Sequence, residues 1–188
     1  MKKQHIYGIL LLLFSTTVLA HPGHSLPNAY AGFAHPFMGW DHLLMMLAVG
    51  VWAAKSTGRI RWQLPLTFIA FMALGACLGF SGLNVPGLET AIASSVIAMG
   101  VLLLTTFSMS KKASISIAAI FALLHGMAHG LAFYGLQNNS ALLGMLAATA
   151  MLHSAGYFVS LQQHQVKHWL SKGLAFLMML IGSFLLVF

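Results

Sequence analysis

Charged residues are scarce in this sequence. Of 188 residues only 6% are charged, and just two of them, Asp41 and Glu89, are acidic. A soluble domain carries about 25% charged residues, so the composition excludes an ordinary soluble protein. With 59% hydrophobic residues and a mean hydropathy of +0.87, the chain is expected to be a membrane protein embedded in the lipid bilayer.

Other absences exclude further classes. The single cysteine, Cys77, lies in an apolar run, so no internal disulfide can form, and this side chain is expected to be small and buried. The Lys and Arg residues lie in short, separate segments rather than on one face, which argues against nucleic acid as a partner. No Gly-rich phosphate loop and no GxSxG motif occur, so nothing predicts ATP hydrolysis.

The first twenty residues resemble a cleavable signal peptide. Lys2 and Lys3 form a positive start, residues 6–17 form an apolar stretch too short for a comfortable span, and Val18-Leu19-Ala20 precedes a cleavage point. The mature chain would then begin at His21. The alternative is an uncleaved first span.

Residues 21–188 are expected to form a single transmembrane domain. Apolar stretches of about 20 residues, the length of a membrane-crossing helix, alternate with short polar segments. No segment shows the alternating polarity of a membrane β-strand, so we expect an all-α membrane protein, a bundle of about six transmembrane helices. The expected spans are Gly32–Ala54, Leu64–Leu83, Leu88–Phe107, Ser114–Tyr134, Ala141–Leu161 and Leu170–Phe188.

Loop charges predict the orientation of this bundle. If the mature N-terminus lies outside, every mature Lys and Arg falls on the inner side, as the positive-inside rule requires. These residues are Lys55, Arg59, Arg61, Lys111, Lys112, Lys167 and Lys172. We therefore expect a multi-pass protein of a bacterial cytoplasmic membrane with both mature termini outside.

Glycines recur at four-residue spacing in two of the expected spans. Gly75 and Gly79 form one pair, and Gly126 and Gly130 form the other. This spacing lets membrane helices approach closely, so the glycines are expected to serve packing rather than chemistry.

Histidines and one aspartate carry the functional signal. His35 and His42 are seven residues apart and share a helix face if a helix begins near Pro36, with Asp41 about 100° around from His42. Ionisable groups inside a bilayer are costly unless paired or hydrated. A role is therefore expected for each of these three side chains.

Two later spans contribute further imidazoles. His125 and His129 are spaced i, i+4 on one face, and His153 lies in the next span. Their depths place all these groups in the outer half of the membrane, near the midplane, where they could meet. Neutral imidazoles with a carboxylate suit Ni²⁺, Co²⁺, Zn²⁺ or Cu²⁺ and suit Mg²⁺ or Ca²⁺ poorly.

Three further candidates lie nearer the outer surface. Glu89 begins the third span, where it is either a helix N-terminal charge favoured by the dipole or part of a metal path. His21 and His24 would follow the cleavage point and could capture metal weakly at the mouth.

The stretch "HPFMGWDH" at 35–42, followed by Met45 and "AVG", resembles the HP-x-x-G-x-DH signature of the HupE/UreJ family of nickel and cobalt permeases. "PGLETAIASSV" (86–96), "HGMAHG" (125–130) and "LHSAG" (152–156) are similar to further family segments. The resemblance implies six spans after a signal peptide and a metal path lined by His35, Asp41, His42, His125 and His129, with Glu89 and His153 added.

The resemblance also has functional implications. It implies Ni²⁺ or Co²⁺ as the transported ion, no prosthetic group, and delivery to hydrogenase or urease maturation proteins. The family segment after the second histidine commonly continues to a Glu, whereas Leu131 and Ala132 stand here. A carboxylate is thereby removed from the expected nickel path.

The expected function is transition-metal uptake by a secondary or potential-driven permease, not an enzymatic reaction. Two alternatives remain open at this point. A bis-His haem membrane protein would also place paired histidines on helices. A membrane metal-dependent hydrolase would need Asp41 or Glu89, the only carboxylate side chains, as its general base.

The signal-peptide pattern and the loop charges generate a topological prediction. N-terminal sequencing of the membrane-extracted protein should start at His21, and a reporter fused after Phe188 should lie outside. A Met1 start together with a cytoplasmic reporter would contradict the predicted topology.

Overall fold

Seven α-helices and one short 3-10 helix form the described part of the chain, without a strand among these residues. The computed structural model describes residues 28–105, 109–135, 139–161 and 164–188. The helices are α2 (Ala29–Ala34), η1 (His35–Phe37), α3 (Trp40–Lys55), α4 (Ile60–Phe80), α5 (Leu88–Leu104), α6 (Lys111–Ala132), α7 (Asn139–Val159) and α8 (His164–Val187). The all-α prediction is confirmed, whereas the expected signal peptide, His21 and His24 lie outside the described residues.

Polar residues start two of these helices. The Asn28 side chain accepts a hydrogen bond from the Ala31 N–H at 2.8 Å before α2, and the Ser110 side chain accepts one from the Ala113 N–H at 3.2 Å before α6. Each cap satisfies a backbone donor that the first helical turn leaves free. The apolar sequences that follow then continue as helices.

Long apolar helices make this a multi-pass membrane protein. Four of the described helices have the length and apolarity of a membrane span: α4, α6, α7 and the part of α8 from Trp169 to Val187. The α2–η1 segment and α3 meet the same criteria together, as one bent pair. Helix α5 is apolar but has only 17 residues, which is near the lower limit for crossing a bilayer.

The expected first span is bent rather than straight. Its two parts meet at 86°, so the expectation of a helix that begins near Pro36 is wrong. Pro36 lies in the 3-10 turn, and Gly39 adopts an extended conformation with φ −110° and ψ 125° before α3 begins at Trp40. The bend places His35 and His42 on different helical segments.

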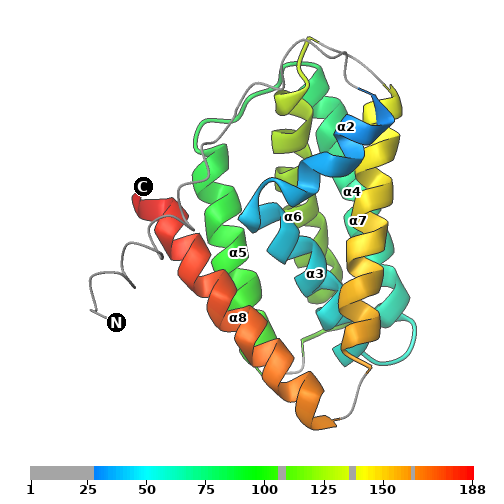
Figure 1. Cartoon of the computed structure of the whole chain (residues 1–188), viewed down its shortest axis with the longest axis vertical. Coiled ribbons are helices and arrows are strands. Elements are labelled where there is room, and N and C mark those ends of the chain that lie inside the picture. The colour runs from blue at the N-terminus through cyan, green and yellow to red at the C-terminus, as the bar shows by residue number, and fades with distance from the viewer. Residues whose placement is uncertain (1–27, 106–108, 136–138, 162–163) are drawn as a thin grey trace, which may run out of the picture.

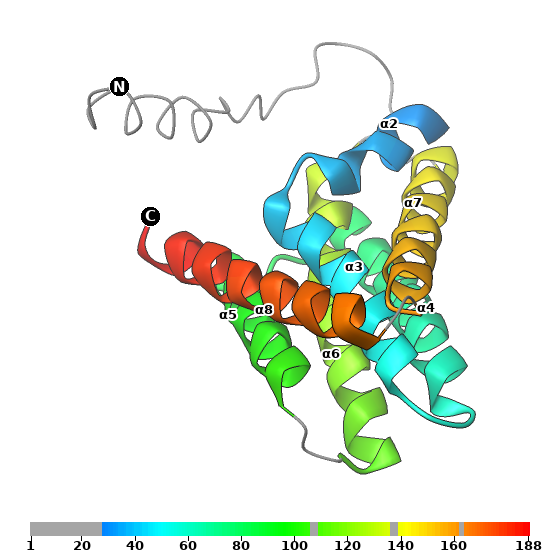
Figure 2. The ribbon, with the colours of Figure 1, turned by 60° about the horizontal axis from the view of Figure 1, so that its bottom comes forward.

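Helix α3 lies in the middle of the bundle, between α7 on one side and α5 and α8 on the other (Figure 1, Figure 2). Met45, Met46 and Val49 of α3 are fully buried. They belong to one apolar core with buried side chains of α4, α5, α7 and α8, among them Phe68 and Met145. A polar side chain on α3 is therefore held close to other helices and away from lipid.

Glycines bring α4 and α6 together, as the four-residue spacing predicts. A Cβ added to Gly75 would collide with the Leu123 carbonyl oxygen, and one added to Gly126 would collide with that of Met72. Gly79, one turn after Gly75, lies against Met127, one turn after Leu123. The contacts therefore advance in the same direction along both helices, which run parallel. This close parallel pair fixes the height of the α6 histidines relative to α4.

Cys77 is exposed on α4, which corrects the expectation of a buried side chain. In a membrane bundle the outer surface meets lipid, and a small apolar side chain is stable there without protein neighbours. Large apolar residues are exposed for the same reason, Leu66 and Leu180 by 65% each.

The glycine contact between α4 and α6 predicts the effect of enlarging it. Gly75→Leu should destabilise the protein by about 1–3 kcal/mol, because backbone atoms of α6 occupy the space that the new side chain needs. Thermal unfolding in detergent measures the change. Gly173→Leu is the matched control, since a Cβ at Gly173 meets nothing within 4 Å, and equal destabilisation by both variants would contradict the packing role.

Candidate metal centre

Four histidines from three helical segments form one group, which we term the imidazole cluster: His35 of η1, His42 of α3, and His125 and His129 of α6. The His42 ring centroid lies 4.3 Å from that of His129 and 5.1 Å from that of His125. The His35 ring lies 5.0 Å from that of His129. The structure therefore brings together residues that are up to 94 positions apart in the chain (129 − 35).

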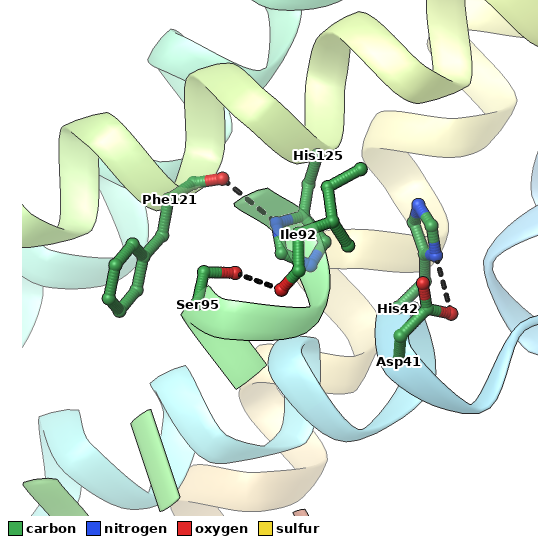
Figure 3. Close-up of polar contacts among 6 residues, drawn as sticks. All are labelled: Asp41, His42, Ile92, Ser95, Phe121 and His125. Atoms are coloured by element: carbon green, nitrogen blue, oxygen red, sulfur yellow. Dashed lines mark hydrogen bonds and ion pairs between the residues drawn. The ribbon is translucent and has the colours of Figure 1, made fainter. Parts of the chain in front are cut away.

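Asp41 holds His42 in one orientation. The Nδ1 atom of His42 lies 2.8 Å from Oδ1 of Asp41, and the two side chains are only 14% and 15% exposed. Figure 3 shows this pair at the start of α3, across from His125. Because a carboxylate accepts hydrogen bonds, Nδ1 is the donor, and Nε2 of the neutral ring retains its lone pair. A carboxylate behind an imidazole is the usual support of a metal-binding histidine.

A backbone carbonyl orients His125 in the same way. Its Nδ1 lies 2.9 Å from the carbonyl oxygen of Phe121, one helical turn earlier (Figure 3). A carbonyl oxygen only accepts, so Nδ1 carries the proton and Nε2 carries the lone pair. The α6 backbone therefore fixes the tautomer in which Nε2 of His125 can bind a metal ion.

The interior nitrogens of these rings have no hydrogen-bond partner. Six buried side-chain nitrogen or oxygen atoms of the described residues lack one, and five of the six are imidazole nitrogens. These five are His42 Nε2, His125 Nε2, His129 Nδ1, His129 Nε2 and His153 Nε2. By contrast, the buried Ser95 hydroxyl donates to the Ile92 carbonyl at 2.7 Å (Figure 3). Unpaired buried polar groups are costly, so a ligand for these nitrogens is expected.

The cluster is not one closed coordination site. Within the described ranges, no three His, Cys, Asp or Glu side chains are arranged so that they could hold one metal ion together. Neighbouring rings instead contact each other in sequence, from His35 through His129 and His42 to His125. Such a row of neighbouring imidazoles differs from a structural metal site, in which four ligands surround one ion.

His153 lies apart from the cluster, beyond the ring of Phe68. Its Nδ1 donates to the Met46 carbonyl oxygen at 2.7 Å, which leaves Nε2 with the lone pair. The fully buried Phe68 ring contacts His153 at 5.2 Å and His125 at 6.2 Å. The expectation that all the imidazoles meet therefore holds for four of them, and an aromatic ring lies between the fourth and the fifth.

Comparison with known proteins identifies the family. The family model described as "HupE / UreJ protein" matches residues 9–185. The chain is also 38% identical over 138 residues to "Protein HupE" of Rhizobium leguminosarum bv. viciae, covering 73% of this chain and 72% of that protein. The chain belongs to the HupE/UreJ family. No solved structure matches it.

The resemblance seen in the sequence is thereby confirmed. The HupE/UreJ family is associated with nickel and cobalt transport, and its members are transporters or accessory proteins and are not known as enzymes. Membership supports a role in metal uptake in general.

One expected acidic contribution to this HupE/UreJ site, that of Glu89, is not seen beside the cluster. Glu89 is exposed in the first turn of α5 and forms no ion pair or hydrogen bond with the histidines of the described residues. Its place at a helix N-terminus favours the interpretation that its negative charge interacts with the helix dipole rather than with a metal ion. The segment after His129, in which the family commonly has a Glu, ends α6 here with Leu131 and Ala132 and supplies no carboxylate. Asp41 is therefore the one carboxylate that the described structure brings to the cluster.

Sequence reasoning missed Gly39 and Phe68. A Cβ on Gly39 would lie 2.6 Å from Oδ1 of Asp41 and 3.1 Å from Nδ1 of His42. The glycine in the HP-x-x-G-x-DH signature thus makes room for the Asp41–His42 pair. Its place inside the motif could have indicated this role. Phe68 lies in an ordinary apolar run, and no sequence signal distinguishes it.

The space at Gly39 leads to a prediction for the HupE/UreJ site. Gly39→Ala should weaken binding of Ni²⁺ by the purified protein about 10- to 100-fold, the usual cost of disturbing the support of a metal-binding histidine. The backbone angles of Gly39 are open to alanine, so the clash with Asp41 is the cause. Calorimetric titration in detergent measures the affinity, with Gly173→Ala as control. Unchanged affinity in Gly39→Ala would contradict the supporting role of Asp41.

Proposed function

We propose that this protein takes up a divalent transition metal, Ni²⁺ or Co²⁺, across a bacterial cytoplasmic membrane. One observation carries the proposal: five imidazole nitrogens are buried without partners inside an apolar bundle. Membership of a family associated with nickel and cobalt transport supports it. The mature N-terminus faces outward, and the ion is released to the cytoplasm, where maturation proteins of hydrogenase or urease are the proposed recipients.

The ligand chemistry favours borderline metal ions. Neutral imidazole lone pairs bind Ni²⁺, Co²⁺, Zn²⁺ and Cu²⁺, whereas Mg²⁺ and Ca²⁺ require mainly oxygen ligands. Asp41 supplies one negative charge beside the rings and partly offsets the double charge of the ion in a medium of low dielectric. Because few carboxylates are present, discrimination against Mg²⁺ and Ca²⁺ rests on the imidazoles.

The histidines lie at successive depths in the membrane. His129 and His125 lie about 5 and 11 Å from the outer end of α6, and His153 lies about 21 Å from the outer end of α7, at 1.5 Å per residue. His35 is only partly buried and receives the hydrated ion. The ion passes to His129 and His42, then to His125, and reaches His153 after the Phe68 ring moves aside.

The membrane potential is a sufficient driving force. An inward movement of two charges across 100 mV releases about 4.6 kcal/mol, which corresponds to accumulation of about 10³-fold. No nucleotide-binding motif occurs in the sequence. Uptake therefore proceeds as potential-driven permeation along weak, successive sites, from which the ion can leave as readily as it enters.

The geometry does not favour the two alternative functions. Haem held by two histidines needs a flat macrocycle between their rings, but the cluster rings already touch at 4.3–5.1 Å. A metal-dependent hydrolase needs a free carboxylate as base. Asp41 is engaged with His42, and Glu89 is exposed at the start of α5.

Reconstituted transport tests the proposed function. Purified protein in proteoliposomes with an imposed inside-negative potential should take up Ni²⁺ or Co²⁺ faster than empty liposomes, and the rate should fall when the potential is collapsed. Zn²⁺, Cu²⁺ and Mg²⁺ are measured in parallel. Uptake of Mg²⁺ at the rate of Ni²⁺ would contradict an imidazole-lined path.

Variants of the cluster give a graded prediction in the same assay. Asp41→Asn and His42→Ala should abolish uptake, because the first removes the charge behind His42 and the second removes a central ligand. His35→Ala should reduce it less, since water can replace a ligand at a partly exposed position. His125→Ala and His129→Ala should each reduce it severely, and the double variant should be hardly worse than the worse single one. Wild-type rates in Asp41→Asn, per inserted protein, would contradict the metal path.

A further inference from the structure

A second polar site lies at the opposite end of α4 and α6. A cavity of about 650 Å³ opens where these two helices begin, and its lining includes Gln63 and Leu66 of α4 and Lys111, Lys112 and Ile115 of α6. The imidazole cluster is far from it. His129 lies 18 residues beyond Lys111 on the same helix, a distance of about 27 Å.

The lysines of this cavity have no carboxylate of the chain to neutralise them. The sequence contains only two acidic residues; Asp41 is paired with His42, and Glu89 begins α5. Because α5 starts on the side where α4 ends, Glu89 and the cavity lie at opposite ends of α4. The anionic partner of Lys111 and Lys112 must therefore come from outside the chain.

One more unpaired atom belongs to this cavity. Gln63 Oε1 is the single buried side-chain atom without a hydrogen-bond partner, among the described residues, that is not an imidazole nitrogen. It is an acceptor and requires a donor such as a hydroxyl group. The cavity thus presents two cations, an unmet acceptor, and the apolar side chains of Leu66 and Ile115.

We infer that this cavity binds an anionic phospholipid whose headgroup carries hydroxyl groups. The phosphate lies against Lys111 and Lys112, a headgroup hydroxyl donates toward Gln63, and an acyl chain continues along Leu66 and Ile115. Leu66 is 65% exposed on the surface that meets lipid, so the cavity is open to the bilayer. Basic pockets between membrane helices recognise anionic headgroups in this way. The inference does not depend on the proposed transport function.

Native mass spectrometry of the purified, delipidated protein tests the inference. Phosphatidylglycerol is the probe, phosphatidylcholine with the same acyl chains is the neutral comparison, and inorganic phosphate is the competitor. We expect phosphatidylglycerol to bind at least about tenfold more tightly than phosphatidylcholine, without competition from millimolar phosphate. Equal binding of the two lipids, or displacement by free phosphate, would overturn the assignment.

Variants distinguish specific binding in the cavity from general attraction of anionic lipid to positive charge. Lys111→Gln with Lys112→Gln should weaken phosphatidylglycerol binding about tenfold or more, whereas Lys55→Gln with Lys172→Gln removes the same charge from α3 and α8, outside the cavity lining, and should leave it near the wild-type value. Ser116→Trp keeps both lysines but fills the cavity that Ser116 lines, and should also weaken binding. Thermal unfolding confirms that each variant is folded. Equal losses in the two double variants, or full binding in Ser116→Trp, would overturn the site.

Discussion

A nitrogen lone pair that no neighbouring group satisfies is costly inside an apolar bundle, and this protein buries several of them. Two hydrogen bonds set their directions: Asp41 accepts from Nδ1 of His42, and the Phe121 carbonyl accepts from Nδ1 of His125. Both bonds turn an Nε2 lone pair toward the interior, where it stays unpaired. In the proposed function, these unpaired nitrogen atoms are the ligands that replace water around the metal ion.

The packing of the helices maintains this arrangement. Helix α3 packs against α4, α5, α7 and α8, so His42 at its start is shielded from lipid. The glycine contacts between α4 and α6 set the height of His125 and His129, and the same parallel pair places Phe68 of α4 between His125 and His153. The 86° bend before α3 turns His35 back over His129. Each of these features brings ligands from distant parts of the sequence into contact.

Much of this organisation could be predicted from the sequence. Apolar length indicated the helices, four-residue spacing indicated the glycine contact, and intramembrane position selected His42, His125 and His129. The bend could not be derived, because Pro36 is equally compatible with the first turn of a continuous helix. The turn of Asp41 toward His42 depends on the space beside Gly39, and Phe68 is set by tertiary packing, which no local pattern reports.

X-ray absorption at the nickel edge of the Ni²⁺-loaded, purified protein tests the central claim most directly. We expect the multiple-scattering signature of at least two imidazoles in the first shell, with one fewer in His42→Ala and no sulfur contribution from the many buried methionines. A spectrum dominated by sulfur, or one of a fully hydrated ion without imidazole, would contradict the assignment of the cluster as the metal path.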